Sequence, residues 1–167
     1  MKKFPSVIIV LMIILSLCAC AVEETQKVNL DGSHIDLNFI ESFPFVPGSM
    51  DDAENWFHNN GYEIESVDEQ NAEIIAIYHG NSSWKINVMR GYCYYRGFAA
   101  TLWLTSEVTS DELGIIFSSV HNELKELYGE PTRVWADGKR YEFTDNDLSI
   151  ELYLEEDWVE LFIGYVQ

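Results

Sequence analysis

The chain has 167 residues, which suffices for one ordinary domain and a short appendage. Apolar residues make up 47% of the chain and aromatic residues 14%, a composition that can bury a core and that excludes a disordered protein. The 28 acidic residues outnumber the 10 basic residues, so the surface repels nucleic acids and anionic lipid headgroups. This charge favours either simple solubility or a cationic partner, and it argues against a nucleic-acid partner.

The N-terminus has the form of an export signal. Two lysines precede the apolar run 7–17, which is too short to span a bilayer as a stable helix. The sequence LCAC at 17–20 resembles the lipobox of bacterial lipoproteins. This resemblance covers residues 1–20 only, and it implies removal of 1–19 as a signal peptide and attachment of lipid, such as palmitate, to Cys20.

A second cleavage pattern overlaps the first. Residues 19–21 are Ala-Cys-Ala, and cleavage after them would release a secreted chain that begins at Val22. That alternative leaves Cys20 without a purpose, whereas lipidation uses it. We therefore expect an exported protein, anchored by lipid to the extracytoplasmic face of a bacterial membrane, with residues 20–33 as a polar tether. Lipidation of Cys20 would leave Cys93 as the one remaining cysteine of the mature chain, which excludes an intrachain disulfide.

The first half of the domain combines a helix with a run of strands. Residues 34–39 alternate between apolar and polar side chains, which predicts a leading strand. A helix is expected to begin after Ser49, with Asp52 in its first turn and a stop at 59–61, where Asn-Asn-Gly offers left-handed backbone geometry. Four strands are then expected, at 62–67, 72–79, 84–89 and 95–105.

The second helix has the clearest signature in the sequence. Thr109 and Glu112 match a capping box, and apolar residues follow at spacings of three and four up to a terminal glycine. These signals predict a helix over 110–128. In the meander that follows, Asp137-Gly138 predicts a two-residue hairpin. Four further strands are expected, at 132–136, 139–144, 148–154 and 158–165.

These elements predict one globular α+β domain over 34–167, with two helices and about eight antiparallel strands. The domain divides into two helix-plus-meander halves, 49–105 and 109–165, a pattern that a diverged duplication would produce. The arrangement is similar to that of β-lactamase inhibitor proteins and of small envelope-assembly lipoproteins. The chain shares no motif with either group, so the similarity implies no residue role and no activity.

The sequence offers no catalytic constellation and no metal site. The acids within 145–156 have the spacing of a calcium-binding EF-hand loop, but Ile150 stands where that loop needs glycine, and the alternation over 148–154 favours a hairpin. None of the four histidines belongs to a short ligand pair. Cys93 would need a nearby histidine, such as His79, to act as a nucleophile, and we expect an inert thiol. No catalytic residue, metal or cofactor is predicted.

One local anomaly is the segment 90–97, with the sequence RGYCYYRG, which carries two of the eight basic residues of the mature chain. Tyrosine together with arginine is the composition of contact surfaces. The alternative is an ordinary strand pair whose tyrosines cover the sheet and whose arginines pair with nearby acids. The candidate residues for ligand or partner contact are Arg90, Tyr92, Tyr94, Tyr95 and Arg96.

The predicted anchor, tether and compact domain favour a lipid-anchored binding or adaptor module at the bacterial envelope. The sequence predicts membrane association through the lipid on Cys20, together with a cationic or protein partner. Two alternatives stay open. One is an enzyme acting on envelope polymers, which would need convergent carboxylates or a Cys93–histidine pair. The other is an acidic inhibitor or immunity-type protein that blocks a basic target.

Overall fold

A computed structural model describes residues 34–46, 48–92 and 95–166. The expected signal peptide, Cys20 and the tether lie outside the described residues, as do Cys93 and Tyr94. Within the described residues, three helices and eight strands follow one another along the chain. The mixed α+β class predicted from the sequence is therefore confirmed.

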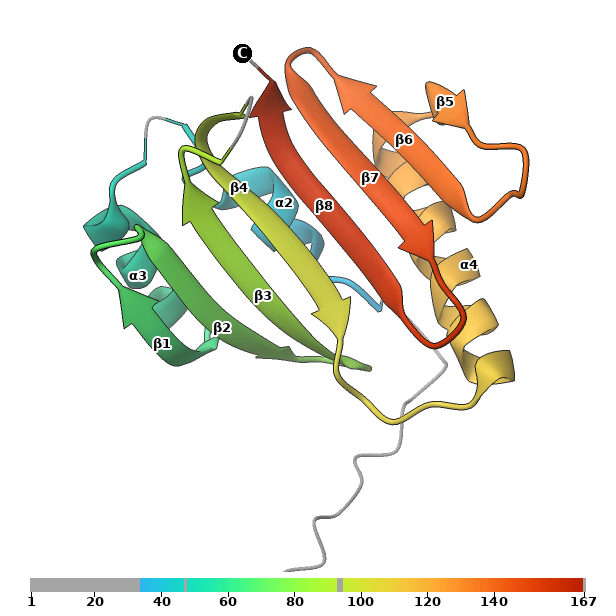
Figure 1. Ribbon diagram of the computed structural model, residues 1–167, viewed down its shortest axis with the longest axis horizontal. Helices are drawn as coiled ribbons and strands as arrows, with labels where there is room; N and C mark the ends of the chain where they lie inside the picture. The colour runs from blue at the N-terminus through green and yellow to red at the C-terminus, as the bar shows by residue number, and fades with distance from the viewer. Residues whose placement is uncertain (1–33, 47, 93–94, 167) are drawn as a thin grey trace, which may run out of the picture.

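The eight strands form a single antiparallel sheet (Figure 1). Their order is β1-β2-β3-β4-β8-β7-β6-β5, so the two four-stranded meanders join where β4 pairs with β8. Every expected strand from 62 onward is present, with small shifts at the ends. The strands are β1 (Glu63–Asp68), β2 (Glu73–His79), β3 (Ser83–Arg90), β4 (Tyr95–Leu104), β5 (Arg133–Val134), β6 (Arg140–Asp145), β7 (Leu148–Leu154) and β8 (Val159–Val166).

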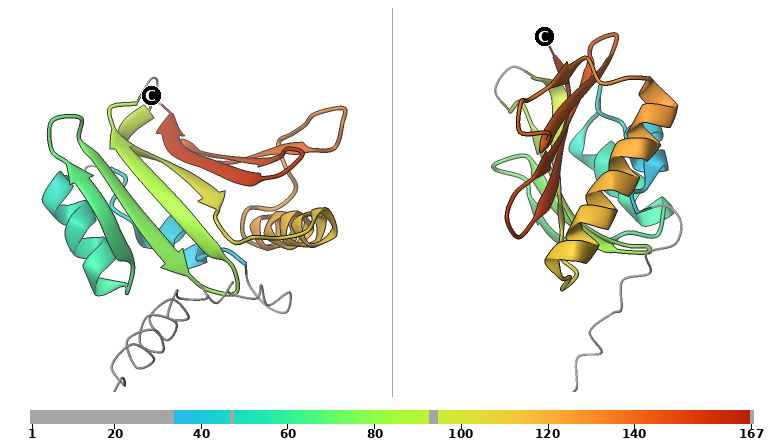
Figure 2. Two further views of the ribbon diagram at one scale, coloured as in Figure 1. Left: turned by 60° about the horizontal axis from the view of Figure 1, so that its bottom comes forward. Right: turned by 90° about the vertical axis from the view of Figure 1, so that its right-hand side faces the viewer.

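The three helices lie on the same side of the sheet (Figure 2). They are α2 (Leu37–Ser42), α3 (Met50–Asn59) and α4 (Ser110–Tyr128). Helix α4 packs behind β6, β7 and β8, and the two shorter helices lie behind the first meander. Within the described residues, the sheet therefore has one face that helices cover and one face that they do not.

Helices α3 and α4 begin where their caps satisfy backbone N–H groups that have no partner within the helix. In α3, the Ser49 hydroxyl accepts the Asp52 N–H at 3.2 Å, and the Asp52 carboxylate accepts the Ser49 N–H at 3.0 Å. In α4, the Thr109 hydroxyl accepts the Glu112 N–H at 3.3 Å, and the Glu112 carboxylate accepts the Thr109 N–H at 2.7 Å. The observed bounds of α4 coincide with the predicted helix at 110–128.

The covered face packs into one apolar core. Phe39 on α2 lies at the centre of its aromatic part and is fully buried. Its ring centroid is 4.9–6.3 Å from those of five other rings, a range typical of favourable aromatic pairs. The five rings belong to Phe43, Phe45, Trp56, Phe57 and Tyr62. This cluster fixes α2, α3 and the connection between them beneath the first meander.

The strand expected at 34–39 is wrong, because this segment begins helix α2 and raises the number of helices from two to three. The Asp36 carboxylate accepts the Asn38 N–H at 3.0 Å and caps the helix. Phe39 and Ile40 are both buried, and two consecutive buried residues fit the inner face of a helix together with Phe43. A strand with one wet face would have exposed one of the two.

The two-residue hairpin expected at Asp137-Gly138 is also wrong, because the turn is longer. The Gly138 N–H donates to the Trp135 carbonyl at 2.9 Å, and the Trp135 N–H donates to the Arg140 carbonyl at 3.1 Å, so residues 136–139 form the turn. Gly138 has a φ of 67°, which glycine adopts readily. By contrast, Asp145 pairs directly with Leu148, which confirms the hairpin predicted there in place of a calcium loop.

Candidate binding face

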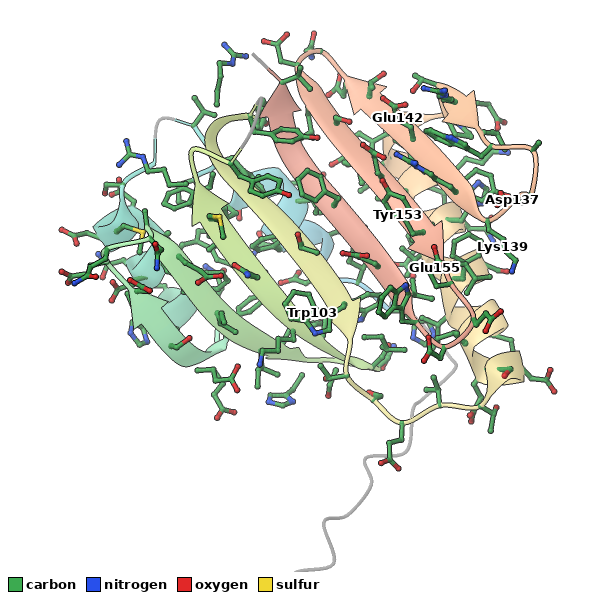
Figure 3. All side chains as sticks on the ribbon, in the orientation of Figure 1. Trp103, Asp137, Lys139, Glu142, Tyr153 and Glu155 are labelled. Atoms are coloured by element: carbon green, nitrogen blue, oxygen red, sulfur yellow. The ribbon has the colours of Figure 1, made fainter. Side chains whose placement is uncertain are left out.

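The sheet face opposite the helices, which we name the open face, carries large aromatic side chains. Because side chains alternate along a strand, each buried residue is followed by one that projects from the open face. Figure 3 shows Trp103 on β4 and Tyr153 on β7 in front of the sheet, with the helices behind. Two adjacent hollows cross this face over β3, β4 and β8.

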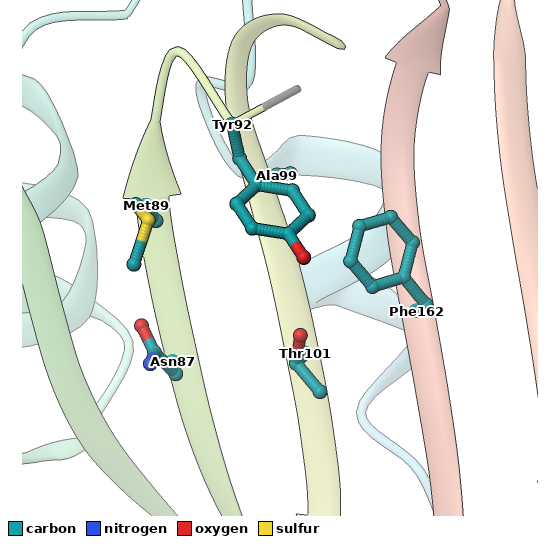
Figure 4. A pocket seen from close by; sticks show the side chains of 6 residues that line it. All are labelled: Asn87, Met89, Tyr92, Ala99, Thr101 and Phe162. Carbon is teal, nitrogen blue, oxygen red and sulfur yellow. The ribbon is translucent and has the colours of Figure 1, made fainter. Parts of the chain in front are cut away.

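The first hollow, which we name the tyrosine hollow, has a volume of about 130 Å³ (Figure 4). Tyr92 extends from the turn between β3 and β4, and its ring centroid lies 5.9 Å from that of Phe162 on β8. Tyr95 adds a second ring at 5.0 Å from Phe162. The hollow is lined by Asn87, Met89, Tyr92, Ala99, Thr101 and Phe162.

The second hollow, which we name the tryptophan hollow, has a volume of about 310 Å³. It is lined by Asn87, Thr101, Trp103, Trp158 and Glu160. The two hollows share Asn87 and Thr101, so they form one continuous trough on the open face. Trp158 is 50% exposed, and Tyr92 in the adjacent hollow is 43% exposed.

Strand register places Glu160 among three aromatic side chains. Glu160 on β8 pairs with Trp103 on β4 and with Tyr153 on β7, and directly opposed residues have Cβ atoms about 4.5–5.5 Å apart. Trp158 lies two positions before Glu160 and therefore projects from the same face. The Glu160 carboxylate thus lies next to three aromatic side chains.

Burial raises the pKa of Glu160, and the neighbouring negative charge of Glu155 raises it further. Within the described residues, no hydrogen bond or ion pair of this carboxylate compensates for these effects. The nearest cations in its row of the sheet have other partners: Lys85 pairs with Glu65, and Arg140 pairs with Glu151. The ionised form of Glu160 is therefore only weakly stabilised by its surroundings.

Asn87 supplies the second polar group of the trough. Its side-chain N–H donates to the Glu73 carboxylate at 2.7 Å, which fixes the amide. The Asn87 Oδ1 atom is buried and has no hydrogen-bond partner among the described residues. A buried acceptor without a partner costs free energy, and binding of a donor would recover that cost.

Beyond Tyr153, the open face carries a group that we name the arginine clamp: Arg140, Trp135, Tyr153 and Glu151. The Arg140 guanidinium lies 4.0 Å from the Trp135 ring centroid and 4.5 Å from that of Tyr153. The Glu151 carboxylate accepts a hydrogen bond from the same guanidinium. Two aromatic rings and one carboxylate therefore hold one guanidinium on this face.

The structure divides the site residues predicted from the sequence. Tyr92 and Tyr95 meet over Phe162 on the open face. Arg96 turns to the other side of β4, where it pairs with Asp147. Arg90 is exposed at the end of β3, and Tyr94 lies outside the described residues. The predicted segment therefore contributes Tyr92 to the lining of the trough, while Tyr95 packs against the lining residue Phe162.

Sequence reasoning missed Trp103, Trp158 and Glu160. A signal for them was present, because β4 and β8 carry large apolar residues at both alternating sets of positions. Trp103 and Phe162 occupy positions that a strand with one wet face would fill with polar residues. Trp103 and Phe162 share the open face of one sheet region only because β4 pairs with β8, and no local sequence pattern predicts that pairing.

The part of the chain that the structure describes shows no grouped metal-ligating side chains. No group of three or more histidine, cysteine, aspartate or glutamate side chains there is arranged to hold a metal ion. His79 lies near Ser83, at 3.3 Å, and near Glu63, at 3.4 Å. Among the described helices, none has both the length and the apolar character needed to cross a membrane.

Comparison with known proteins gives no match to any family model, curated protein or solved structure.

Proposed function

We propose that this protein is a lipid-anchored binding module of the bacterial envelope and that its trough binds a partner protein. The observation that carries the proposal is the uncovered sheet face, on which exposed aromatic rings surround a few polar groups. Such a composition is typical of protein-binding surfaces, where aromatic anchors supply most of the binding free energy. The trough residues lie mainly on paired strands, so binding would order few of them and would cost little conformational entropy.

Lipidation of Cys20 would hold the module at the membrane surface. Residues 21–33 are polar and would act as a flexible tether with a root-mean-square span of about 20 Å. With the signal peptide removed, eight basic residues would face 28 acidic residues, a net charge of −20. A tether of this length would keep so acidic a domain away from an acidic membrane surface.

We also propose that the two halves, 49–105 and 109–165, are a diverged duplication. Support comes from topology: each half is a helix followed by a four-stranded meander, and the last strands of the halves, β4 and β8, pair with each other. Trp103 comes from the first half, whereas Trp158 and Glu160 come from the second. The trough would then be a site formed at the junction of two repeats, a common place for ligand sites.

An acidic inhibitor or immunity-type protein is the second candidate, and the charge of the chain favours it. Such a protein would use the same face to block a basic surface on its target. An enzyme acting on envelope polymers has less support. Glu160 has the raised pKa of a general acid, but a second carboxylate in a defined role beside it is not evident.

The proposal is tested by crosslinking in intact envelopes, with a photoreactive residue at Trp103 in one strain and at Ile115 in another. Ile115 on α4 is 47% exposed and lies on the helix side, so it is a matched control. We expect one defined adduct from position 103 and none from position 115. The double variant Trp103→Ala/Phe162→Ala should lose the partner on purification, whereas Ile115→Ala should retain it. Equal capture by both variants would exclude the trough as the binding site.

The proposed lipid anchor on Cys20 is tested by a separate measurement. The intact mass of the mature protein distinguishes a lipidated N-terminus at Cys20 from an unmodified N-terminus at Val22. Cys20→Ser should abolish the lipid-bearing mass and release the protein from the membrane fraction. An unmodified Val22 N-terminus in the wild type would exclude the lipid anchor and leave a secreted protein.

A further inference from the structure

The arginine clamp shows how the open face of this protein holds one of its own cations, the Arg140 guanidinium. Its guanidinium stacks between an indole and a phenol ring and is paired with one carboxylate. A planar guanidinium suits such a site, because its faces stack on aromatic rings while its edge donates hydrogen bonds. A lysine ammonium has no plane to stack and is more strongly hydrated.

The tryptophan hollow repeats this set of groups two strands away. Glu160 supplies the carboxylate, and Trp103 and Trp158 supply the rings. Register places Trp103 directly opposite Glu160, so an aromatic ring and the carboxylate are cross-strand neighbours in the hollow. The hollow therefore has the aromatic and anionic groups of the clamp but no arginine of its own.

Neighbouring side chains do not supply that cation. Lys85 lies on the far side of Trp103 and pairs with Glu65, while Arg140 lies beyond Tyr153 and pairs with Glu151. Asn87 also lines the hollow, but its buried Oδ1 atom points toward Met89, on the side of the tyrosine hollow (Figure 4). A ligand that brings several N–H donors and a positive charge would compensate the Glu160 carboxylate.

We propose that the tryptophan hollow binds the guanidinium of an arginine side chain on the partner protein. This inference rests on the proposed function, since it names the group that the trough recognises. The arginine stacks against Trp103 and Trp158 and donates to the Glu160 carboxylate. The acidic excess of the chain attracts such a cationic partner from a distance and speeds association.

The test uses a short blocked peptide, acetyl-Gly-Arg-Gly-amide, as the probe and the purified protein as the receptor. Binding is followed by the NMR signals of the tryptophan indole N–H groups. We expect the signals of Trp103 and Trp158 to shift with arginine and to stay unchanged with the citrulline peptide, which keeps the shape but lacks the charge. The lysine peptide should bind several-fold more weakly.

Glu160→Gln should weaken binding of the arginine peptide about tenfold, as expected for loss of one charge-assisted hydrogen bond. The matched control is Glu69→Gln, which removes the same charge from the exposed turn between β1 and β2. It should change the affinity by less than about twofold, since the two sites are far apart on the sheet. Equal weakening by both variants would show that only net charge matters and would overturn the proposal.

The variants and peptides distinguish failure of this inference from failure of the proposed function. If Trp103→Ala/Phe162→Ala loses the natural partner while Glu160→Gln keeps it and the arginine peptide causes no shift, then the trough binds a partner without an arginine. If all these variants keep the partner, the trough is not the binding site. Equal shifts with the arginine and citrulline peptides would also overturn the proposal, because neutral stacking would then explain the binding.

Discussion

At the scale of single residues, Glu160 is expected to reduce the stability of the fold. Its pKa is raised, so the folded protein holds this proton to a higher pH than the unfolded chain does. Above the folded-state pKa the carboxylate is ionised at a free-energy cost, and the cost disappears as the pH falls below the usual glutamate range, near about 4.3. A residue that lowers stability in this way is typical of a binding site.

Glu160→Gln is therefore predicted to raise the urea midpoint of unfolding at pH 7 and to leave it nearly unchanged at pH 4. The glutamine keeps the size of the side chain and removes the charge that burial and Glu155 disfavour. Urea titrations at the two pH values, with Glu69→Gln as the exposed control, check the prediction. The same shift at both pH values would mean that ionisation of Glu160 is not the cause.

At the scale of elements, the bulge in β4 connects the sheet to the loop that precedes α3. The register of β4 with β8 shifts between Arg96 and Ala99, and Gly97 has a φ of 72°. The Phe98 N–H donates to the Phe45 carbonyl oxygen at 2.9 Å, and not to a neighbouring strand. The bulge thus redirects one backbone donor from the sheet to the loop that carries the aromatic core.

Gly97→Ala is predicted to destabilise the protein more than Gly91→Ala, although both glycines have a φ of 72°. A Cβ at Gly97 would lie 1.9 Å from the Phe45 carbonyl oxygen, whereas a Cβ at Gly91 would meet nothing within 4 Å. Gly91→Ala should cost about 1–2 kcal/mol for its backbone conformation, and Gly97→Ala about 1–3 kcal/mol more for the clash. Urea unfolding measures both, and equal costs would show that the loop simply moves away.

The elements that the sequence predicted well have signals contained within a few residues. Helix α4 has its capping box and a full apolar stripe, and β7 has strict alternation, so both were predicted with correct bounds. Helix α2 was missed because six residues carry little periodicity, and the burial of Phe39 and Ile40 depends on contacts with α3. The turn at 136–139 was misjudged because Gly138 also fits a longer turn.

The candidate binding site was predictable only in part, for a related reason. Tyr92 and Tyr95 belong to one short segment rich in tyrosine and arginine, and both rings contact Phe162 in the trough. Trp103 and Glu160 are far apart along the chain, and the register between β4 and β8 alone makes them neighbours. Register between strands that are distant in sequence is set by the whole core, so a single sequence does not reveal it.

At the scale of the whole molecule, the acidic excess has opposite consequences for folding and for binding. Like charges repel within the folded domain, and this repulsion lowers its stability at low ionic strength. The same charges would attract the proposed cationic partner, and salt would screen both effects. The Debye length falls from about 30 Å at 0.01 M salt to about 8 Å at 0.15 M.

Raising sodium chloride from 0.01 to 0.15 M is therefore predicted to increase the melting temperature of the protein and to weaken its binding of the arginine peptide. Thermal scans and peptide titrations across this range measure the two responses on one sample. In Glu160→Gln the rise in melting temperature should persist, because the net charge changes by only one unit. The salt dependence of binding should shrink in this variant, because the charge that meets the guanidinium is gone. A melting temperature that falls with salt would mean that attractive ion pairs, such as the one between Lys85 and Glu65, outweigh the repulsion.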